Sequence, residues 1–205
     1  MLNEKNKQLI ELLLESGALK FGEFTLKSGA KSPFFINLGN VGSGRQMNLL
    51  GECMANRIHE SFKKTDILFG PAHKGISLAT AAAMACWQLY HMDLGVLFDR
   101  KEAKAHGEGG EFIGCMPEDG SRILLIDDVL TSGLTKREGI AALKKAFNIE
   151  SVEILVIVDR RSKQAAANDS LNFSSLLCIK DLIEYLEQKN DGRGKTIQQW
   201  WETSA

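Results

Sequence analysis

The sequence predicts an α/β fold with a mostly parallel central sheet flanked by helices. From about residue 66 onward, short apolar segments alternate with segments of helical periodicity. The apolar segments are continuous, which is typical of strands buried on both faces of a parallel sheet. Polar residues follow these segments, at the strand ends where such sheets bind ligands. The length of 205 residues fits one domain.

Two kinds of element precede this alternation. Residues 4–16 have the spacing of an amphipathic helix, with Gly17 as a stop signal. Residues 21–39 (FGEFTLKSGAKSPFFINLG) predict two short strands joined by a turn at Ser28–Gly29. Residues 45–63 return to helical spacing. The predicted apolar faces of the two helices are Leu9, Ile10, Leu13 and Leu14 in the first, and Met47, Leu50, Met54, Ile58 and Phe62 in the second.

The alternation then predicts the elements of the sheet and its cover. The predicted strands are 66–70, 94–98, 122–126, 152–158 and 175–179, and the predicted helices are 76–90, 135–147 and 180–189. The loops between them are expected at 71–75, 98–111, 127–133 and 159–170. Polar chemistry follows four of the strands, at His73–Lys74, Arg100–Lys101, Asp127–Asp128 and Asp159–Arg160. We expect these side chains at one edge of the sheet.

Composition excludes several classes of protein. The net charge of −1 and the pI near 6.4 give no global attraction to nucleic acid or to an acidic membrane. The N-terminus is polar, and the longest apolar stretch, at 76–87, is too short to span a membrane. The cysteines are far apart and form no CxxC pair, so we expect reduced, mostly buried thiols. These observations predict a cytoplasmic protein without nucleic-acid or membrane partners.

The stretch RILLIDDVLTSGLTKREGI, residues 122–140, carries the most specific chemistry. A strand delivers Asp127 and Asp128 to its end, and hydroxyl residues and Gly133 lead into a helix. Backbone N–H groups of such a loop and the helix N-terminus form a phosphate cradle. Carboxylates repel phosphate, so the pair suits sugar hydroxyls or Mg²⁺ bridged through water. The stretch therefore predicts a ribose 5-phosphate site; the alternative is a turn with an ordinary helix cap.

Other nucleotide-binding motifs are missing. The sequence has no GxxxxGK[ST] phosphate loop and no GxGxxG dinucleotide fingerprint. Instead, LLIDDVLTSG resembles the phosphoribosyl diphosphate (PRPP) signature of type I phosphoribosyltransferases. LKFGEFTLKSGAKSPFFINLG, FGPAHKGISLA and FDRKEAKAHGEGG resemble the hood segment, the diphosphate loop and the mobile catalytic loop of the orotate phosphoribosyltransferase branch. The resemblance implies the type I phosphoribosyltransferase fold in a single domain, 1–205. Residues 1–45 would form the N-terminal helix and most of a small hood, and 46–205 the core and C-terminal elements.

The resemblance also implies roles for individual residues. The carboxylates of Asp127 and Asp128 would contact ribose hydroxyls, and the loop that follows would hold the 5-phosphate. The resemblance places the catalytic groups at Arg100, Lys101, Lys104, His106, Asp127 and Asp128. It places the PRPP-binding residues at Lys27, His73, Lys74, Arg100, Lys101, Lys104, His106, Asp127, Asp128, Val129, Leu130, Thr131, Ser132, Gly133, Leu134 and Thr135.

Orotate contacts are implied at Lys27, Phe34, Phe35, Thr131 and Arg160, with Arg161 as a rival for the role of Arg160. The alternatives are core packing for the two phenylalanines and solvent exposure for Lys27, Lys74 and His106. In strict strand alternation, one of the two phenylalanines must point away from the core.

Two positions depart from the family pattern. Leu134 stands where threonine usually contacts the 5-phosphate, and His73 stands where tyrosine is common. Thr135 is a candidate to replace the missing hydroxyl. The role of the C-terminal pair Trp200–Trp201 is open.

The implied reaction is displacement of diphosphate from PRPP by orotate, giving orotidine 5′-monophosphate in pyrimidine (UMP) biosynthesis. Mg²⁺ is the expected cofactor, bound mainly through PRPP and water rather than by a dedicated protein site. A homodimer with shared active sites is the expected assembly. The rival functions are transfer to a purine or to uracil, and a non-catalytic PRPP-binding regulator.

Overall fold

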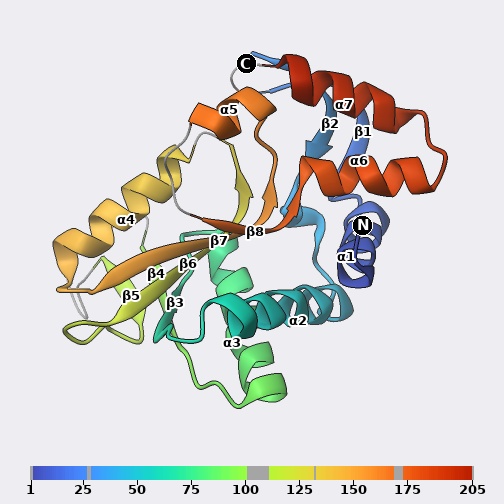
Figure 1. Ribbon diagram of the computed structural model, residues 1–205. Coiled ribbons are helices and arrows are strands. Elements are labelled where there is room, and N and C mark those ends of the chain that lie inside the picture. The colour runs from blue at the N-terminus through green and yellow to red at the C-terminus, as the bar shows by residue number, and fades with distance from the viewer. Residues whose placement is uncertain (1, 27–28, 101–110, 132, 169–172, 205) are drawn as a thin grey trace.

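The computed structural model describes residues 2–26, 29–100, 111–131, 133–168 and 173–204. Within these residues, the central sheet has the strand order β5-β4-β3-β6-β7-β8, and a separate pair is formed by β1 and β2 (Figure 1). The strands are β1 (Leu19–Thr25), β2 (Lys31–Ile36), β3 (Ile67–Phe69), β4 (Gly95–Asp99), β5 (Phe112–Gly114), β6 (Arg122–Leu130), β7 (Ser151–Asp159) and β8 (Ser174–Cys178). The helices are α1 (Glu4–Glu15), α2 (Gly44–Ser61), α3 (Lys74–Tyr90), α4 (Leu134–Ala146), α5 (Lys163–Asn168), α6 (Ile179–Gln188) and α7 (Arg193–Thr203), with a 3-10 turn at Leu38–Asn40.

The mostly parallel sheet predicted from the sequence is confirmed. β4, β3, β6, β7 and β8 pair in parallel, and β5 pairs antiparallel with β4 at one edge. Because the parallel strands all end at the same edge, the polar residues at or just beyond the carboxyl ends of β3, β4, β6 and β7 are brought to that edge. The Arg160 amide donates a hydrogen bond to the Leu130 carbonyl at 3.2 Å. This bond extends the β6–β7 ladder as far as Arg160.

The sheet is buried on both faces, as its continuous apolar strands require. On β6, Leu124 and Ile126 belong to the larger core, which includes residues of α2 and α3. Ile123 and Leu125 belong to the second core, with Leu143 of α4. Successive residues thus serve opposite faces, and helices cover the sheet on both sides (Figure 1).

The small β1–β2 sheet lies beside the C-terminal helices (Figure 1). The two strands are antiparallel, with Phe21 opposite Phe34 and Lys20 opposite Phe35. Alternation along β2 buries Phe34 completely and leaves Phe35 40% exposed, as the strand pattern predicted. α7 packs on β2 and on α6, so residues from both ends of the sequence build this part of the molecule.

Several element boundaries differ from the sequence prediction. β6 continues through Asp127 to Leu130, where a loop was predicted, because Val129 and Leu130 pair with Val158 and Asp159 of β7. α3 begins at Lys74 rather than at residue 76. The predicted loop at 159–170 contains the short, alanine-rich helix α5. β5 and α7 had no counterpart in the prediction.

The helix faces and the cysteines were predicted in part. In α1, Leu12 is buried with Leu9, Ile10 and Leu13, while Leu14 is half-buried. All four cysteines are free thiols. Cys86 is buried, which raises the pKa of its thiol to about 11, whereas Cys115 is exposed and contradicts the expectation of mostly buried thiols. Among the described residues, no helix combines the length and the apolar character needed to cross a membrane.

Candidate functional site

The two adjacent carboxylates lie near the end of β6, inside the strand ladder. The Asp128 amide donates to Asp127 Oδ1 at 2.8 Å, and the Val129 amide donates to Asp128 Oδ1 at 2.7 Å. Both carboxylate side chains are largely buried, with 16% of each exposed. The backbone therefore fixes the directions of both side chains at the carboxyl edge of the sheet.

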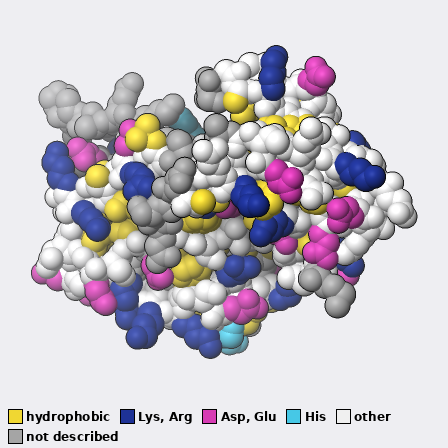
Figure 2. Space-filling model, turned by 45° about the horizontal axis from the view of Figure 1, so that its top comes forward, with side chains coloured by type: hydrophobic (Ala, Val, Ile, Leu, Met, Phe, Trp, Pro, Cys, Tyr) yellow, Lys and Arg dark blue, Asp and Glu magenta, His cyan; other side chains and the backbone are white. Residues whose placement is uncertain are grey.

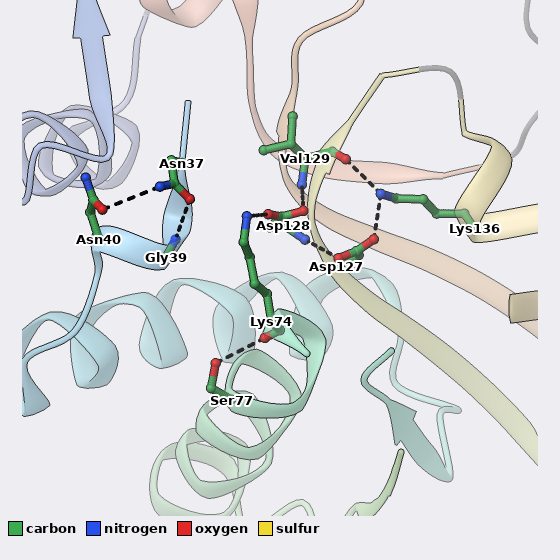
Figure 3. A network of polar contacts seen from close by, with 9 residues as sticks. All are labelled: Asn37, Gly39, Asn40, Lys74, Ser77, Asp127, Asp128, Val129 and Lys136. Atoms are coloured by element: carbon green, nitrogen blue, oxygen red, sulfur yellow. Dashed lines mark hydrogen bonds and ion pairs between the residues drawn. The ribbon is translucent and has the colours of Figure 1, made fainter. Parts of the chain in front are cut away.

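Each carboxylate is paired with a lysine from a different helix (Figure 3). Lys74, the first residue of α3, places its Nζ 2.7 Å from Asp128 Oδ2. Lys136 of α4 places its Nζ 2.5 Å from Asp127 Oδ2. The two ammonium groups approach the carboxylates from opposite sides (Figure 3). Each carboxylate therefore has its own cationic partner.

Lys136 is the site residue that the sequence reasoning missed. It is 5% exposed, and its Nζ also donates to the Val129 carbonyl at 2.8 Å. Burial raises the pKa of Asp127, while the charge and hydrogen bond of Lys136 oppose that rise. A weak signal was present, because a lysine in the first turn of a helix opposes the helix dipole and needs another reason to be there.

The chain enters α4 through a backbone conformation suited to a phosphate cradle. Gly133 has a φ of 71° and is the N-cap, and no side-chain cap is present in the described residues. Thr131 is exposed, and Leu134 is 59% exposed at the first helical position. The predicted contact at Ser132 lies outside the described residues, as does the side chain of Thr135.

Arg160 follows β7 and reaches toward β2. It is 8% exposed, its guanidinium lies 5.3 Å from the centre of the Phe34 ring, and its NH2 lies 3.4 Å from the Ser32 hydroxyl. Burial lowers its pKa, yet an arginine stays charged at neutral pH. No carboxylate of the described residues pairs with Arg160, so this buried cation is suited to an anionic ligand.

Arg161 has a different environment. Its Nε donates to Asp159 Oδ1 at 2.9 Å and its NH2 donates to Asp159 Oδ2 at 3.0 Å. The guanidinium also lies 4.3 Å from the centre of the Phe173 ring. A two-point bond to a neighbouring carboxylate neutralises this arginine, so Arg160 fits the role of an anion ligand better than Arg161.

The diphosphate-loop candidates lie between β3 and α3. His73 is exposed, and the Ala72–His73 peptide bond is cis. The Ala72 amide donates to Asp99 Oδ1 at 2.6 Å, which ties this loop to the end of β4.

The base of the predicted catalytic loop is closed by a backbone bond. The Arg100 amide donates to the Glu111 carbonyl at 2.7 Å. Arg100 Nε is buried and has no hydrogen-bond partner in the described part of the chain. Lys27, Lys101, Lys104 and His106 fall outside the described residues.

Phe34 and Phe35 do not line one surface together. Phe35 packs against Phe24, with the ring centres 5.5 Å apart, and keeps an exposed face. Phe34 is buried beneath Arg160. Contact with a planar ligand is therefore open to Phe35, while the contacts of Phe34 favour a role in holding Arg160. Both contacts with orotate stay predictions.

Known proteins match this arrangement along most of the chain. The family model of the phosphoribosyl transferase domain matches residues 38–183. The orotate phosphoribosyltransferase of Salmonella arizonae is 42% identical over 192 residues, which cover 89% of each chain. The chain belongs to the orotate phosphoribosyltransferase family. The orotate phosphoribosyltransferase of Bifidobacterium adolescentis is 46% identical over 166 residues, which cover 78% of this chain and 72% of that protein.

Solved structures of the orotate phosphoribosyltransferase family share the fold. The crystal structure of the enzyme from Francisella tularensis has a TM-score of 0.78 and 33% identity, and the match covers 94% of this chain and 96% of that one. Leishmania donovani UMP synthase has a TM-score of 0.77 and 26% identity over 96% of this chain and 42% of its own. The predicted fold and family are confirmed.

Proposed function

We propose that this member of the orotate phosphoribosyltransferase family transfers the 5-phosphoribosyl group of PRPP to orotate in UMP biosynthesis. The products are orotidine 5′-monophosphate and diphosphate. The observation that carries this proposal is the buried Arg160, which has no carboxylate partner among the described residues and lies at the same sheet edge as the carboxylates of Asp127 and Asp128. One site thus offers a cation for the orotate carboxylate and anions for the ribose.

The ribose 5-phosphate is assigned to the end of β6 and the start of α4. Backbone N–H groups near Gly133 would hold the phosphate, because the helix N-terminus carries partial positive charge. The contacts would come from Val129, Leu130, Thr131, Ser132, Gly133, Leu134 and Thr135. The exposed Leu134 offers no hydroxyl, so the backbone supplies the contact at that position. Asp127 and Asp128 would face the ribose, whose anomeric carbon becomes positive as diphosphate leaves.

The diphosphate is assigned to Lys74, to the backbone at His73 and to the loop that begins at Arg100. The buried Nε of Arg100, which has no hydrogen-bond partner among the described residues, supports this assignment. Lys101, Lys104 and His106 would complete the cationic surround, and Lys27 would lie between PRPP and the base. Charge grows on the departing diphosphate, so cations placed there stabilise the transition state more than the ground state.

Mg²⁺ is the proposed cofactor. The described residues contain no group of three or more His, Cys, Asp or Glu side chains placed to hold a metal ion. Asp128, already paired with Lys74, would help to hold the ion through water, and PRPP would supply most of its ligands. When bound, Mg²⁺ supplies charge neutralisation for the leaving diphosphate.

The orotate carboxylate is assigned to Arg160, and further contacts with orotate are proposed for Phe35, Thr131 and Lys27. A guanidinium binds a carboxylate through two parallel hydrogen bonds. Arg161 is already engaged with Asp159 in this way, which supports Arg160 as the ligand. Phe34 supports the guanidinium from the side opposite to solvent.

A homodimer is the proposed assembly. Exposed apolar side chains lie on the last turns of α3 and on and after β5, at Met84, Trp87, Leu89, Ile113 and Met116. β5 is joined to β4 by the segment that contains the catalytic loop. An interface at these residues would bring that loop near a neighbouring subunit, which supports shared active sites. We also propose a cytoplasmic location, in keeping with free thiols.

The rival functions receive less support. A purine or uracil phosphoribosyltransferase is not favoured, because the relatives at 41–46% identity are named orotate phosphoribosyltransferases. A nucleic-acid-binding regulator would need a basic face. On the face drawn in Figure 2, the described Lys and Arg side chains are interspersed with Asp and Glu side chains rather than gathered in one basic field.

The deciding experiment follows orotate absorbance with purified protein, PRPP and Mg²⁺. We expect orotate to be consumed and the activity to disappear when EDTA removes the metal. Parallel reactions contain adenine, hypoxanthine, guanine or uracil in place of orotate. Turnover of one of these bases without loss of orotate would contradict the proposal.

A further inference from the structure

The C-terminal helix α7 is attached to β2 through Trp200. The indole N–H of Trp200 donates to the Lys31 carbonyl at 2.8 Å. Lys31 is the first residue of β2, so this bond fixes the helix to the start of the strand that carries Phe34. Ile197 and Gly194, both buried, anchor the same helix against α6. Figure 1 shows α7 lying across the β1–β2 pair.

From Trp200, ring contacts lead directly to Arg160. The Trp200 and Phe34 rings meet edge to face, with centres 5.1 Å apart and planes at 87°. The Phe34 ring also meets the Arg160 guanidinium, which lies 5.3 Å from the ring centre. Ser32 adds a polar contact, since its hydroxyl donates to the Phe34 carbonyl at 2.7 Å and lies 3.4 Å from Arg160 NH2.

We propose that Trp200 is a positioning residue for the orotate-carboxylate contact. It holds the Phe34 ring against Arg160, and the ring fixes the direction of a guanidinium that has no carboxylate partner in the described residues. This inference rests on the proposed function and deepens it. It assigns to the C-terminal helix a part in recognising the base, although α7 lies about 40 residues beyond Arg160 in the sequence.

The physical reason is the conformational entropy that a freely moving arginine side chain loses when it binds a ligand. A two-point contact between a guanidinium and a carboxylate depends on orientation, and long arginine side chains lose considerable rotamer freedom when they are fixed. A guanidinium that is held before the ligand arrives binds more tightly than one that must be ordered on binding. The Phe34 ring, with the Trp200 ring packed against it, provides that order without neutralising the charge.

Trp201 provides a matched control on the same helix. Its ring lies near two lysines, 5.9 Å from Lys163 Nζ and 5.3 Å from Lys180 Nζ. Like Trp200, it is half-buried and packs on the larger core. Loss of either ring removes similar packing from α7, but contact with Phe34 belongs to Trp200.

The experiment compares Trp200→Ala, Trp200→Phe and Trp201→Ala with the wild-type protein. KM for orotate and KM for PRPP are measured separately, with kcat, and thermal unfolding is followed for each variant. We expect Trp200→Ala to raise KM for orotate about tenfold, the loss expected when a ligand contact is misplaced by a fraction of an ångström, with KM for PRPP changed less than about twofold. Trp200→Phe keeps an edge-to-face ring and should recover most of the orotate affinity. Trp201→Ala should leave both constants near the wild-type values.

Three results would overturn the inference. They are an unchanged KM for orotate in folded Trp200→Ala, equal increases in both KM values, and an equal effect from Trp201→Ala. A wild-type protein that consumes no orotate contradicts the proposed function and the inference together. A wild-type protein that consumes orotate, with an unaffected Trp200→Ala variant, contradicts the inference alone.

Discussion

At the scale of single residues, charge pairing separates the groups that hold the site together from those available to a ligand. Asp127 with Lys136 and Asp159 with Arg161 are largely buried pairs whose charges cancel. Arg160 has no such carboxylate partner within the described chain and depends on an aromatic ring. A buried pair contributes little net stability, but removal of one partner is costly because the other charge stays buried.

The first prediction concerns Lys136. Lys136→Met removes the ammonium group that lowers the pKa of Asp127, so burial will raise that pKa further. More Asp127 is then protonated at any given pH, and the acid limb of the kcat/KM profile should move to higher pH. The loss of stability relative to wild type should grow as pH rises, because the unpaired carboxylate is then charged. Activity and thermal unfolding between pH 5 and 9 measure both effects.

Lys144→Met is the matched control, because Lys144 lies in the last turn of the same helix and is exposed. Its pH profile should superimpose on that of the wild-type protein. An acid limb that stays in place in folded Lys136→Met would refute the role given to Lys136.

The second prediction separates the two neighbouring arginines. Arg160→Lys replaces a planar fork by a point charge, and we expect KM for orotate to rise about 10- to 100-fold, the effect of losing a charged hydrogen bond. Arg161→Lys breaks the two-point bond to Asp159 and should lower the melting temperature with little change in KM. Steady-state kinetics and thermal unfolding of the two variants give the comparison. The reverse pattern would assign orotate to Arg161.

At the scale of elements, the close approach of α2 and α3 positions Lys74. A Cβ on Gly51 of α2 would lie 2.7 Å from the Ala81 carbonyl of α3. The junction before α3 is equally tight, since a Cβ on Gly70 would lie 2.2 Å from the Gly75 carbonyl. These contacts are with backbone atoms, which cannot move aside as a flexible side chain can.

The third prediction tests this packing. Gly51→Ala forces the two helices apart and should cost about 1–3 kcal/mol of unfolding free energy, or roughly 2–4 °C of melting temperature per kcal/mol in a domain of this size. Gly44→Ala, in the first turn of the same helix, meets no atom within 4 Å. Because alanine has the higher helix propensity, that control should unfold at the wild-type temperature or slightly above. Equal melting temperatures for the two variants would contradict the prediction.

The elements that the sequence predicted share strong local patterns. The continuous apolar runs of β3, β6 and β7 are visible in the sequence because these strands are covered on both faces. β5 is only three residues long and pairs with β4. A strand this short has no local periodicity from which it could be predicted. α7 has few apolar residues and depends on contacts with α6 and β2, which are distant in sequence and are not predictable from local spacing.

The candidate site also contains residues that local sequence patterns predicted and residues that they did not. Adjacent strand ends predicted Asp127, Asp128, Lys74 and Arg160 at one edge, because parallel strands bring their carboxyl ends together. Lys136 was missed and Trp200 was noted without a role, because the partners of both side chains are defined by side-chain direction and tertiary contact. The continuation of β6 through the carboxylates was also missed, since aspartate is rare in strands and pairing with β7 overrides that preference.

At the scale of the whole molecule, exposed apolar side chains of α3 and β5 are the basis of the proposed dimer interface. Trp87 is 55% exposed and Met84, one turn earlier, is 60% exposed. Met116, just after β5, is 50% exposed. A contiguous exposed apolar patch marks an interaction surface more often than scattered side chains do, so a test must show whether these residues form one interface.

The fourth prediction tests the proposed dimer. Trp87→Glu places a charge at the proposed interface, and we expect monomers with low specific activity if the catalytic loop serves the neighbouring site. Light scattering and activity across a dilution series report both properties. Gln199→Glu adds the same charge on the exposed side of α7 and should keep the wild-type mass. A monomeric wild-type protein with full activity at every concentration would rule out shared sites.

The ion pair between Lys74 and Asp128 affects the meaning of a measured PRPP affinity. If the diphosphate binds Lys74, as proposed, the Asp128 carboxylate competes with the diphosphate for the Lys74 ammonium group. The apparent dissociation constant is then the intrinsic one divided by the fraction of molecules in which Lys74 is released. Salt screens this pair, whose lysine side chain is 48% exposed, and it also screens the diphosphate contact. The two effects oppose each other, so PRPP affinity should fall with ionic strength less steeply than the charge of the diphosphate suggests.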